Sequence, residues 1–257
     1  ASAMADWTKG YRSLLNYWKA QAVATPGFVI RNIMGATWIN SQILGVEMGQ
    51  HMKTSAMRRM AMKSSIDAAK DKKYLRYLED TAKARNIVVD RPVAGHLGSG
   101  SAYLAWKTVE TGQPIKLAGV RGMFRNATDR DWRIFNEIER SGIAGGGQAA
   151  IEVAEKSAMA SMGTWNPLRA HFWPFKAVRA ANTDAEFMVR MTAGRHVMEH
   201  GGSLDEAWKA IRKFHFDYSE LTPTEAKIKM VIPFWKWQKN ILPVLIESIG
   251  NRPAAWS

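Results

Sequence analysis

Apolar side chains recur every three or four positions along most of the chain, which is the spacing of one face of an α-helix. The pattern predicts helices over about residues 3–22, 27–62, 64–85, 100–110, 128–141, 148–162, 167–200, 203–216, 223–232 and 234–249. Strand-like alternation is missing, and the one β-rich run, Ile87–Val89, is too short to build a sheet. We therefore expect an all-α fold.

Helix start signals support this pattern. Ser203 followed by Glu206 is a capping box, in which each side chain bonds the other residue's backbone N–H. Thr222–Pro223 places proline at a first helical position, where its missing N–H costs nothing. Thr128 precedes two acids, which favour the first turn of a helix.

Glycine-rich breaks predict how the chain is organised. We expect an N-terminal long-helix region over 1–85, an irregular Gly-rich connector or tip over 86–127, and a C-terminal helical region with Trp- and Pro-rich corners over 128–257. A helix over 27–62 would be about 50 Å long. That length favours an elongated multi-helix assembly over a compact enzyme.

Composition narrows the function. The 257 residues include 46% hydrophobic residues, enough for a core, and carry a net charge of +13, which favours a polyanionic partner. Without cysteine, disulfides, thiolate metal sites and cysteine nucleophiles are excluded. No signal peptide is visible, and polar residues interrupt the best membrane-spanning candidate, Phe28–Val46. The abrupt ends lead us to expect a segment of a longer polypeptide.

One short pattern is typical of metallopeptidases. His196, Glu199 and His200 match H-x-x-E-H, in which the histidines bind zinc and the glutamate activates water. The alternative is a solvated last helical turn before Gly201, where histidine suits the helix dipole. We favour that alternative, and interpret Gly98–Ser101 and Gly145–Gly147 as connectors rather than phosphate loops. We therefore expect no enzyme activity, metal or cofactor.

A basic run without acids occupies residues 51–63. Methionines are interleaved with its basic residues, which are Lys53, Arg58, Arg59 and Lys63. Such a helix could face DNA or anionic lipid. The alternative is an ordinary amphipathic helix with a basic outer side.

Two aromatic and basic clusters follow. Their large side chains are Trp165, Trp173 and Phe175 in the first cluster, and Phe234, Trp235 and Trp237 in the second. Stacking on single-stranded nucleic acid and anchoring at a membrane interface both use such residues. Subunit packing is the third option. We favour it because neighbouring prolines fix defined bends.

Three segments resemble large phage virion proteins, the internal, ejected or polyvalent proteins carried in the capsid. These are His215–Glu225 (HFDYSELTPTE), Ile232–Pro243 with its P-F-W-K-W element, and Thr25–Gly35 (TPGFVIRNIMG). Thr25 stands where the family usually has Asn. Glu186 and Arg190 fit the family's E-x-x-x-R helix.

The resemblance implies a structural protein packaged inside the virion, in the capsid interior or on the portal or tail axis. It would form a ring or tube of copies, contact portal or tail proteins and packaged DNA, and enter the host envelope on ejection to help deliver DNA. Rigid corners would shape it, built from Asp217, Tyr218, Thr222, Pro223 and Pro233. The alternatives are a non-enzymatic module coating packaged DNA, and a metal-dependent peptidase or cell-wall lytic segment.

Overall fold

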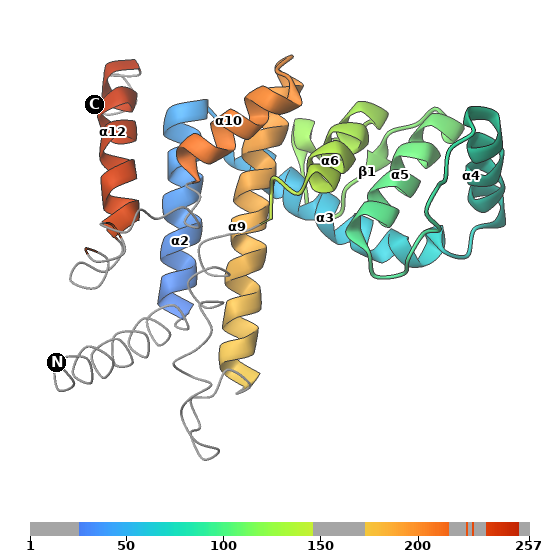
Figure 1. The fold of residues 1–257 in the computed structure, drawn as a ribbon, viewed down its shortest axis with the longest axis horizontal. Coiled ribbons are helices and arrows are strands. Elements are labelled where there is room, and N and C mark those ends of the chain that lie inside the picture. The colour runs from blue at the N-terminus through green and yellow to red at the C-terminus, as the bar shows by residue number, and fades with distance from the viewer. Residues whose placement is uncertain (1–25, 146–172, 216–224, 226–227, 229–234, 252–257) are drawn as a thin grey trace, which may run out of the picture. The chain divides into compact units, whose positions relative to one another are not determined.

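The computed structural model describes residues 26–145, 173–215, 225, 228 and 235–251. Within these residues the fold is mostly helical with one two-stranded sheet, so the expected all-α class is confirmed (Figure 1). The chain forms two compact units. Unit 1 comprises residues 1–45, 145–190 and 211–257, and unit 2 comprises 46–144 and 191–210. These units do not follow the predicted boundaries at residues 85 and 127.

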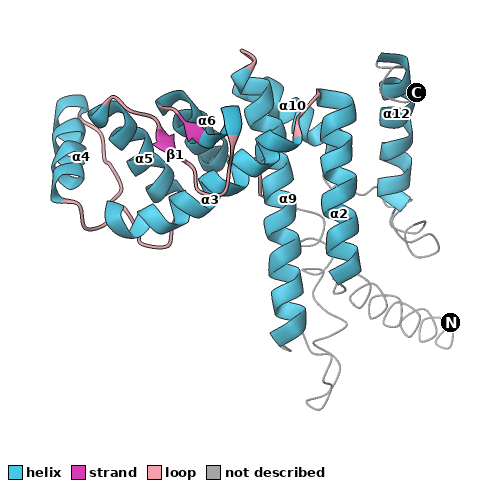
Figure 2. Cartoon of the chain, turned by 180° about the vertical axis from the view of Figure 1, so that it is seen from behind, coloured by secondary structure: helices cyan, strands magenta, loops and turns pink. Residues whose placement is uncertain are grey.

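Unit 2 is built around helix α5 (Leu97–Thr111). Its elements are α3 (Met48–Ala68), α4 (Lys72–Arg85), α5 (Leu97–Thr111), β1 (Ile115–Lys116), η2 (Gly122–Arg125), β2 (Asn126–Ala127) and α6 (Asp129–Ser141), with the last turns of α9 (Trp173–Glu199) and most of α10 (Leu204–Phe214). Helix α5 packs against both α3 and α6 (Figure 2). Met57, Leu104, Trp132 and Phe135 are buried between them.

The contact between α3 and α5 depends on a glycine. A Cβ at Gly100 would overlap the backbone carbonyl of Ala61, so only glycine permits this approach. Gly100 lies inside α5, whose first turn is capped by the His96 side chain accepting from the Ser99 N–H at 3.3 Å. The prediction of a connector at Gly98–Ser101 is therefore wrong.

The predicted irregular region over 86–127 also contains a hydrogen-bonded β-hairpin. Ile115 pairs with Ala127 and Lys116 with Asn126, and the Leu117 N–H donates to the Arg125 carbonyl at 2.6 Å. Leu117 and Val120 are buried. Together with α5, this hairpin supplies core residues to unit 2, so the region is not a separate connector.

The single long helix predicted over 27–62 is wrong, because the chain breaks at Gly45. Helix α2 (Pro26–Ile39) continues into a π-helical turn, η1 (Asn40–Leu44), and ends at Gly45 with φ of 77°. Helix α3 then starts at Met48, where Gln50 accepts from the Glu47 N–H at 2.9 Å. The two halves of the predicted helix belong to different units.

Unit 1 holds α2, η1, the first turns of α9, the end of α10 and α12 (Trp235–Asn251). The amide of Asn40 is fully buried and bonds two segments: its nitrogen donates to the Val189 carbonyl at 3.0 Å, and its oxygen lies 2.9 Å from His215 Nε2. These bonds fix the π-helical turn. Among the described helices, none combines the length and hydrophobicity needed to cross a bilayer.

Candidate functional site

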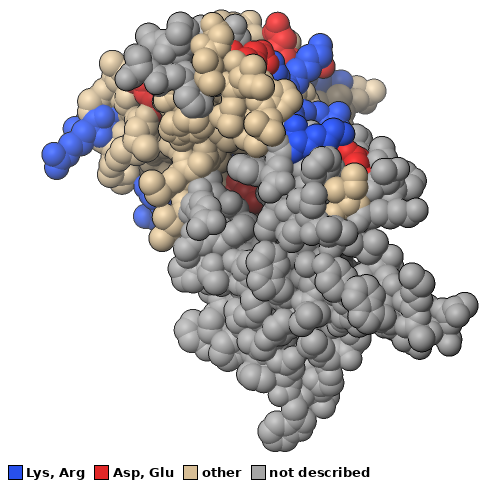
Figure 3. All heavy atoms as spheres, turned by 90° about the vertical axis from the view of Figure 1, so that its left-hand side faces the viewer, with Lys and Arg blue, Asp and Glu red and all other residues tan. Residues whose placement is uncertain are grey.

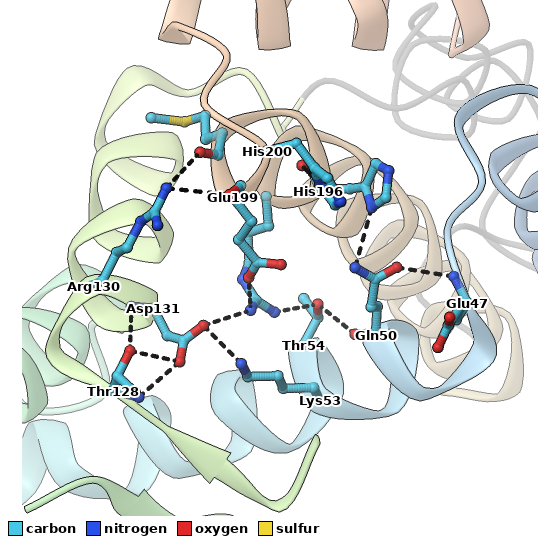
Figure 4. Close-up of polar contacts among 12 residues, drawn as sticks. Glu47, Gln50, Lys53, Thr54, Thr128, Arg130, Asp131, His196, Glu199 and His200 are labelled. Atoms are coloured by element: carbon cyan, nitrogen blue, oxygen red, sulfur yellow. Dashed lines mark hydrogen bonds and ion pairs between the residues drawn. The ribbon is translucent and has the colours of Figure 1, made fainter. Parts of the chain in front are cut away.

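A network of charged side chains lies buried in unit 2 between α3, α6 and the end of α9 (Figure 4). Arg195, whose side chain is 2% exposed, stands at its centre. The guanidinium donates to the Thr54 hydroxyl at 2.7 Å and pairs with Asp131 at 3.4 Å. It also pairs with Glu199, one turn further along α9. Three helices are thus joined through one cation.

Asp131 is the main acceptor of this network. It accepts from Lys53 Nζ at 2.7 Å and from the Thr128 N–H and hydroxyl at 2.7 and 2.9 Å, which completes the predicted cap of α6. Burial raises the pKa of this carboxyl, but the bonds from Lys53 and Thr128 and the charges of Lys53 and Arg195 outweigh it, so the pKa is lowered. The stability it contributes is present above its unfolded pKa and is lost as pH falls through the folded one.

The C-terminal turn of α9 is held at two further points. Arg130 donates to the carbonyls of Glu199 at 3.2 Å and Met198 at 3.5 Å, which satisfies groups that a helix end leaves open. On α3, Gln50 Nε2 lies 3.1 Å from His196 Nδ1. The two cations Lys53 and Arg195 match the two carboxylates Asp131 and Glu199, so the network is balanced in charge and joins α3, α6 and α9.

The H-x-x-E-H pattern does not have the geometry of a zinc site. His200 Nδ1 donates to the His196 carbonyl at 2.8 Å, while His196 Nδ1 accepts from the Gln50 amide. Glu199 is paired with Arg195 rather than placed to activate water. In the part of the chain that the structure describes, no three His, Asp or Glu side chains are arranged to hold a metal ion. These contacts make the three residues part of the hydrogen-bonded last turn of α9, rather than a solvated turn.

The four basic residues of α3 divide between two environments. The Lys53 side chain is 13% exposed and paired with Asp131, so the prediction that it faces DNA or lipid is corrected. Arg58 is half-buried. Arg59 and Lys63 are exposed, and they lie on one helical stripe with Met52 because the three are spaced by seven and four residues.

The hairpin packs against α3 and approaches Arg59 of this stripe. The ring of Phe124 packs on Gly49, and a Cβ at Gly119 would stand 4.0 Å from the Arg59 guanidinium. The hairpin therefore adds its own exposed cations, Arg121 and Arg125, beside α3. We call Arg59, Lys63, Arg121 and Arg125 the basic edge.

The hairpin half of the basic edge lacks acids in its own segment, whereas on α3 the exposed Asp67 lies one turn beyond Lys63. Between Glu110 and Asp129 the sequence contains three basic residues and no acidic residue. Within the described residues, none of the four edge side chains forms an ion pair. The acid-free run was the sequence signal that could have identified the hairpin half of this surface.

Basic residues of unit 1 are arranged differently. Lys213 pairs with Glu247 at 2.6 Å, and Lys239 with Glu225 at 2.7 Å. On the described part of the face shown in Figure 3, some Lys and Arg side chains lie singly, and others gather beside Asp or Glu side chains. These pairs neutralise part of the charge that the composition counts.

The predicted aromatic anchors and structural corner are not placed by the structure. Trp173 and Phe175 belong to α9, and Trp235 and Trp237 to α12, but only their backbones are described. Seven further residues lie outside the described residues: Trp165, Asp217, Tyr218, Thr222, Pro223, Pro233 and Phe234. Their roles stay predictions.

Comparisons with protein-family models, with curated proteins and with solved structures found no match to this chain. The resemblance to ejected phage proteins therefore remains an inference from the sequence segments described above.

Proposed function

We propose that this chain is a non-enzymatic structural segment of a phage virion protein. It is packaged inside the particle, associates with further copies near the portal or tail, and is ejected to help deliver DNA across the host envelope. The three sequence segments that resemble such proteins support the proposal. The described residues add a surface with the charge that such a role needs.

The observation that carries the proposal is the basic edge. Its four side chains are exposed, lie on α3 and the hairpin, and form no ion pair with the described residues. Exposed Lys and Arg side chains that form no ion pair attract phosphate groups and displace their counterions. A protein that accompanies DNA through an envelope meets phosphate groups throughout, first on the DNA and then on the membrane lipids.

Equilibrium binding of the 257-residue chain to a polyanion tests this role. With a DNA duplex, the logarithm of affinity should fall linearly with the logarithm of salt concentration between about 50 and 200 mM. Reversing the edge (R59E, K63E, R121E and R125E) should weaken binding at least tenfold and flatten that slope.

A matched variant controls for net charge. R76E, K83E, R85E and R140E change the charge equally at exposed positions on α4 and α6. The control should bind close to the unmodified chain. Equal losses in both variants would mean that only net charge matters, and absence of binding to both DNA and anionic vesicles would overturn the proposal.

Self-association is the second part of the proposal. Helix α2 contains one charged residue, Arg31, and exposes Ile30, Ile33 and Met34 along one side. We assign this stripe to a second copy of the chain, because a Trp-rich sequence with proline-fixed corners favours ring-like or tubular packing of identical subunits. Sedimentation velocity should show concentration-dependent association that I30E/M34E reduces. A monomer at all concentrations would contradict it.

The basic edge also suits the alternative of a module that coats packaged DNA. That alternative predicts DNA binding by a monomer without any association. Sedimentation of the chain with and without DNA separates the two functions, because only the virion assembly requires association in the absence of DNA.

A further inference from the structure

The surface that carries the basic edge has an apolar component that phosphate binding does not use. Met123 lies between Arg121 and Arg125 in the hairpin and is 83% exposed. So exposed a methionine contributes little to folding stability, because an apolar side chain stabilises a fold through the surface area that it buries.

The fold of the hairpin keeps the Met123 side chain exposed. Phe124, the next residue, packs its ring on Gly49 of α3. Leu117 and Val120 are buried, and Gly122 takes φ of 67°, which a residue with a side chain rarely adopts. Three anchors therefore surround one exposed methionine, so its exposure is a property of the folded loop.

Helix α3 continues the same surface. It exposes Met48, Met52, Met62 and Ile66, and these side chains alternate along the helix with Arg59 and Lys63. The opposite side of α3 is the buried side, with Met57 and Ala61 in the core. Apolar residues thus occupy both sides of this helix, and the core explains only one of them.

We propose that the basic edge and Met123 dock unit 2 on an anionic lipid bilayer, an inference that rests on the proposed function and names the partner of its basic surface. The cations bind lipid phosphates, and Met123, together with the exposed methionines of α3, enters the boundary between headgroups and acyl chains. DNA presents the same phosphates but no apolar layer into which several methionines can pass. The combination of exposed cations and exposed methionines therefore favours lipid over DNA as the partner.

Because the chain contains no cysteine, one substitution introduces a single labelling site. Met123→Cys carrying an environment-sensitive fluorophore should show a several-fold rise in emission with vesicles containing phosphatidylglycerol. Lipids with a quencher on the acyl chain should reduce that emission. Vesicles of phosphatidylcholine alone should produce little change, because they lack the net negative charge that the basic edge requires.

Ala84→Cys on α4 is the control, since this small residue is exposed on another helix of the same unit. Its fluorophore should not respond. A response at Ala84 equal to that at Met123, or vesicle binding without acyl-chain quenching at Met123, would overturn the docking geometry.

The DNA measurement separates failure of this inference from failure of the proposed function. If the edge-dependent DNA binding is present while anionic vesicles leave the Met123 probe unchanged, the lipid inference is wrong and the polyanion role stands. A response of the Met123 probe to DNA alone would assign the methionine to a wedge between base pairs instead. If neither DNA nor vesicles bind, both proposals fail.

Discussion

Helix α3 carries basic residues on two sides, and the two sides use them in opposite ways. Lys53 on the inner side is paired with Asp131 inside a network that also holds Arg195 and Thr54. Arg59 and Lys63 on the outer side are exposed beside methionines. Charge alone does not distinguish these groups. Burial and the nearest carboxylate determine whether a cation serves the fold or can serve a partner.

The largest expected effect tests the inner side. Arg195→Met leaves Glu199, which is partly exposed, without its cation and leaves buried Asp131 with Lys53 alone. Removal of one partner from a buried ion network costs about 3 kcal/mol of folding free energy. Urea unfolding followed by circular dichroism measures the loss. Arg59→Met on the outer side should change the free energy by less than about 0.5 kcal/mol. Similar losses in both variants would remove the distinction between the two sides.

A loss of folding stability no larger than this one tests the packing of α5 against α3. Gly100→Ala drives a Cβ into the Ala61 carbonyl of α3, so α5 must shift, at a cost of about 3 kcal/mol. The same unfolding measurement applies. At Gly35 in α2 a Cβ meets no atom within 4 Å, so Gly35→Ala should be neutral or slightly stabilising. A harmless Gly100→Ala would show that α3 and α5 do not approach this closely.

The next effect is a pH dependence within α3. Burial lowers the pKa of His51 to about 4 from its ordinary value of 6.5. The unfolded chain then binds a proton that the folded chain does not, so folding stability is complete above pH 6.5 and declines as pH falls toward 4. His51→Gln should flatten this part of the profile of melting temperature against pH. An unchanged slope would place the titrating group elsewhere.

Local signals in the sequence predicted much of the helical fold. The predicted helix over 128–141 matches α6 closely, because the Thr128 start signal and the apolar spacing agree, while the helix predicted over 100–110 begins three residues later than α5. The capping box of Ser203 and Glu206 is confirmed, with the Ser203 N–H donating to Glu206 at 2.7 Å. The break at Gly45 was not predicted, since other glycines in the same stretch lie inside helices.

The buried network could not be predicted, because its partners are far apart in the sequence. Lys53 and Asp131 are separated by 78 residues, and Thr54 and Arg195 by 141. The acid-free run over residues 51–63 grouped Lys53 with Arg59 and Lys63. A spacing of six residues nevertheless places Lys53 and Arg59 on different sides of a helix. The absence of acidic residues from the hairpin segment indicated part of the basic edge. Its position beside α3 depends on the packing of Phe124 on Gly49, which the sequence does not indicate.

Lysine footprinting tests the central claim most directly, because one experiment reads the inner and outer sides of α3 together. The chain would be acetylated with and without a saturating polyanion, using duplex DNA and phosphatidylglycerol vesicles in turn, and analysed by mass spectrometry. Lys53 should be slow to react throughout. Lys63 should react readily and become protected by at least one of the two polyanions, while Lys83 on α4 stays unchanged. Protection of Lys83 with Lys63 left fully reactive would contradict the account.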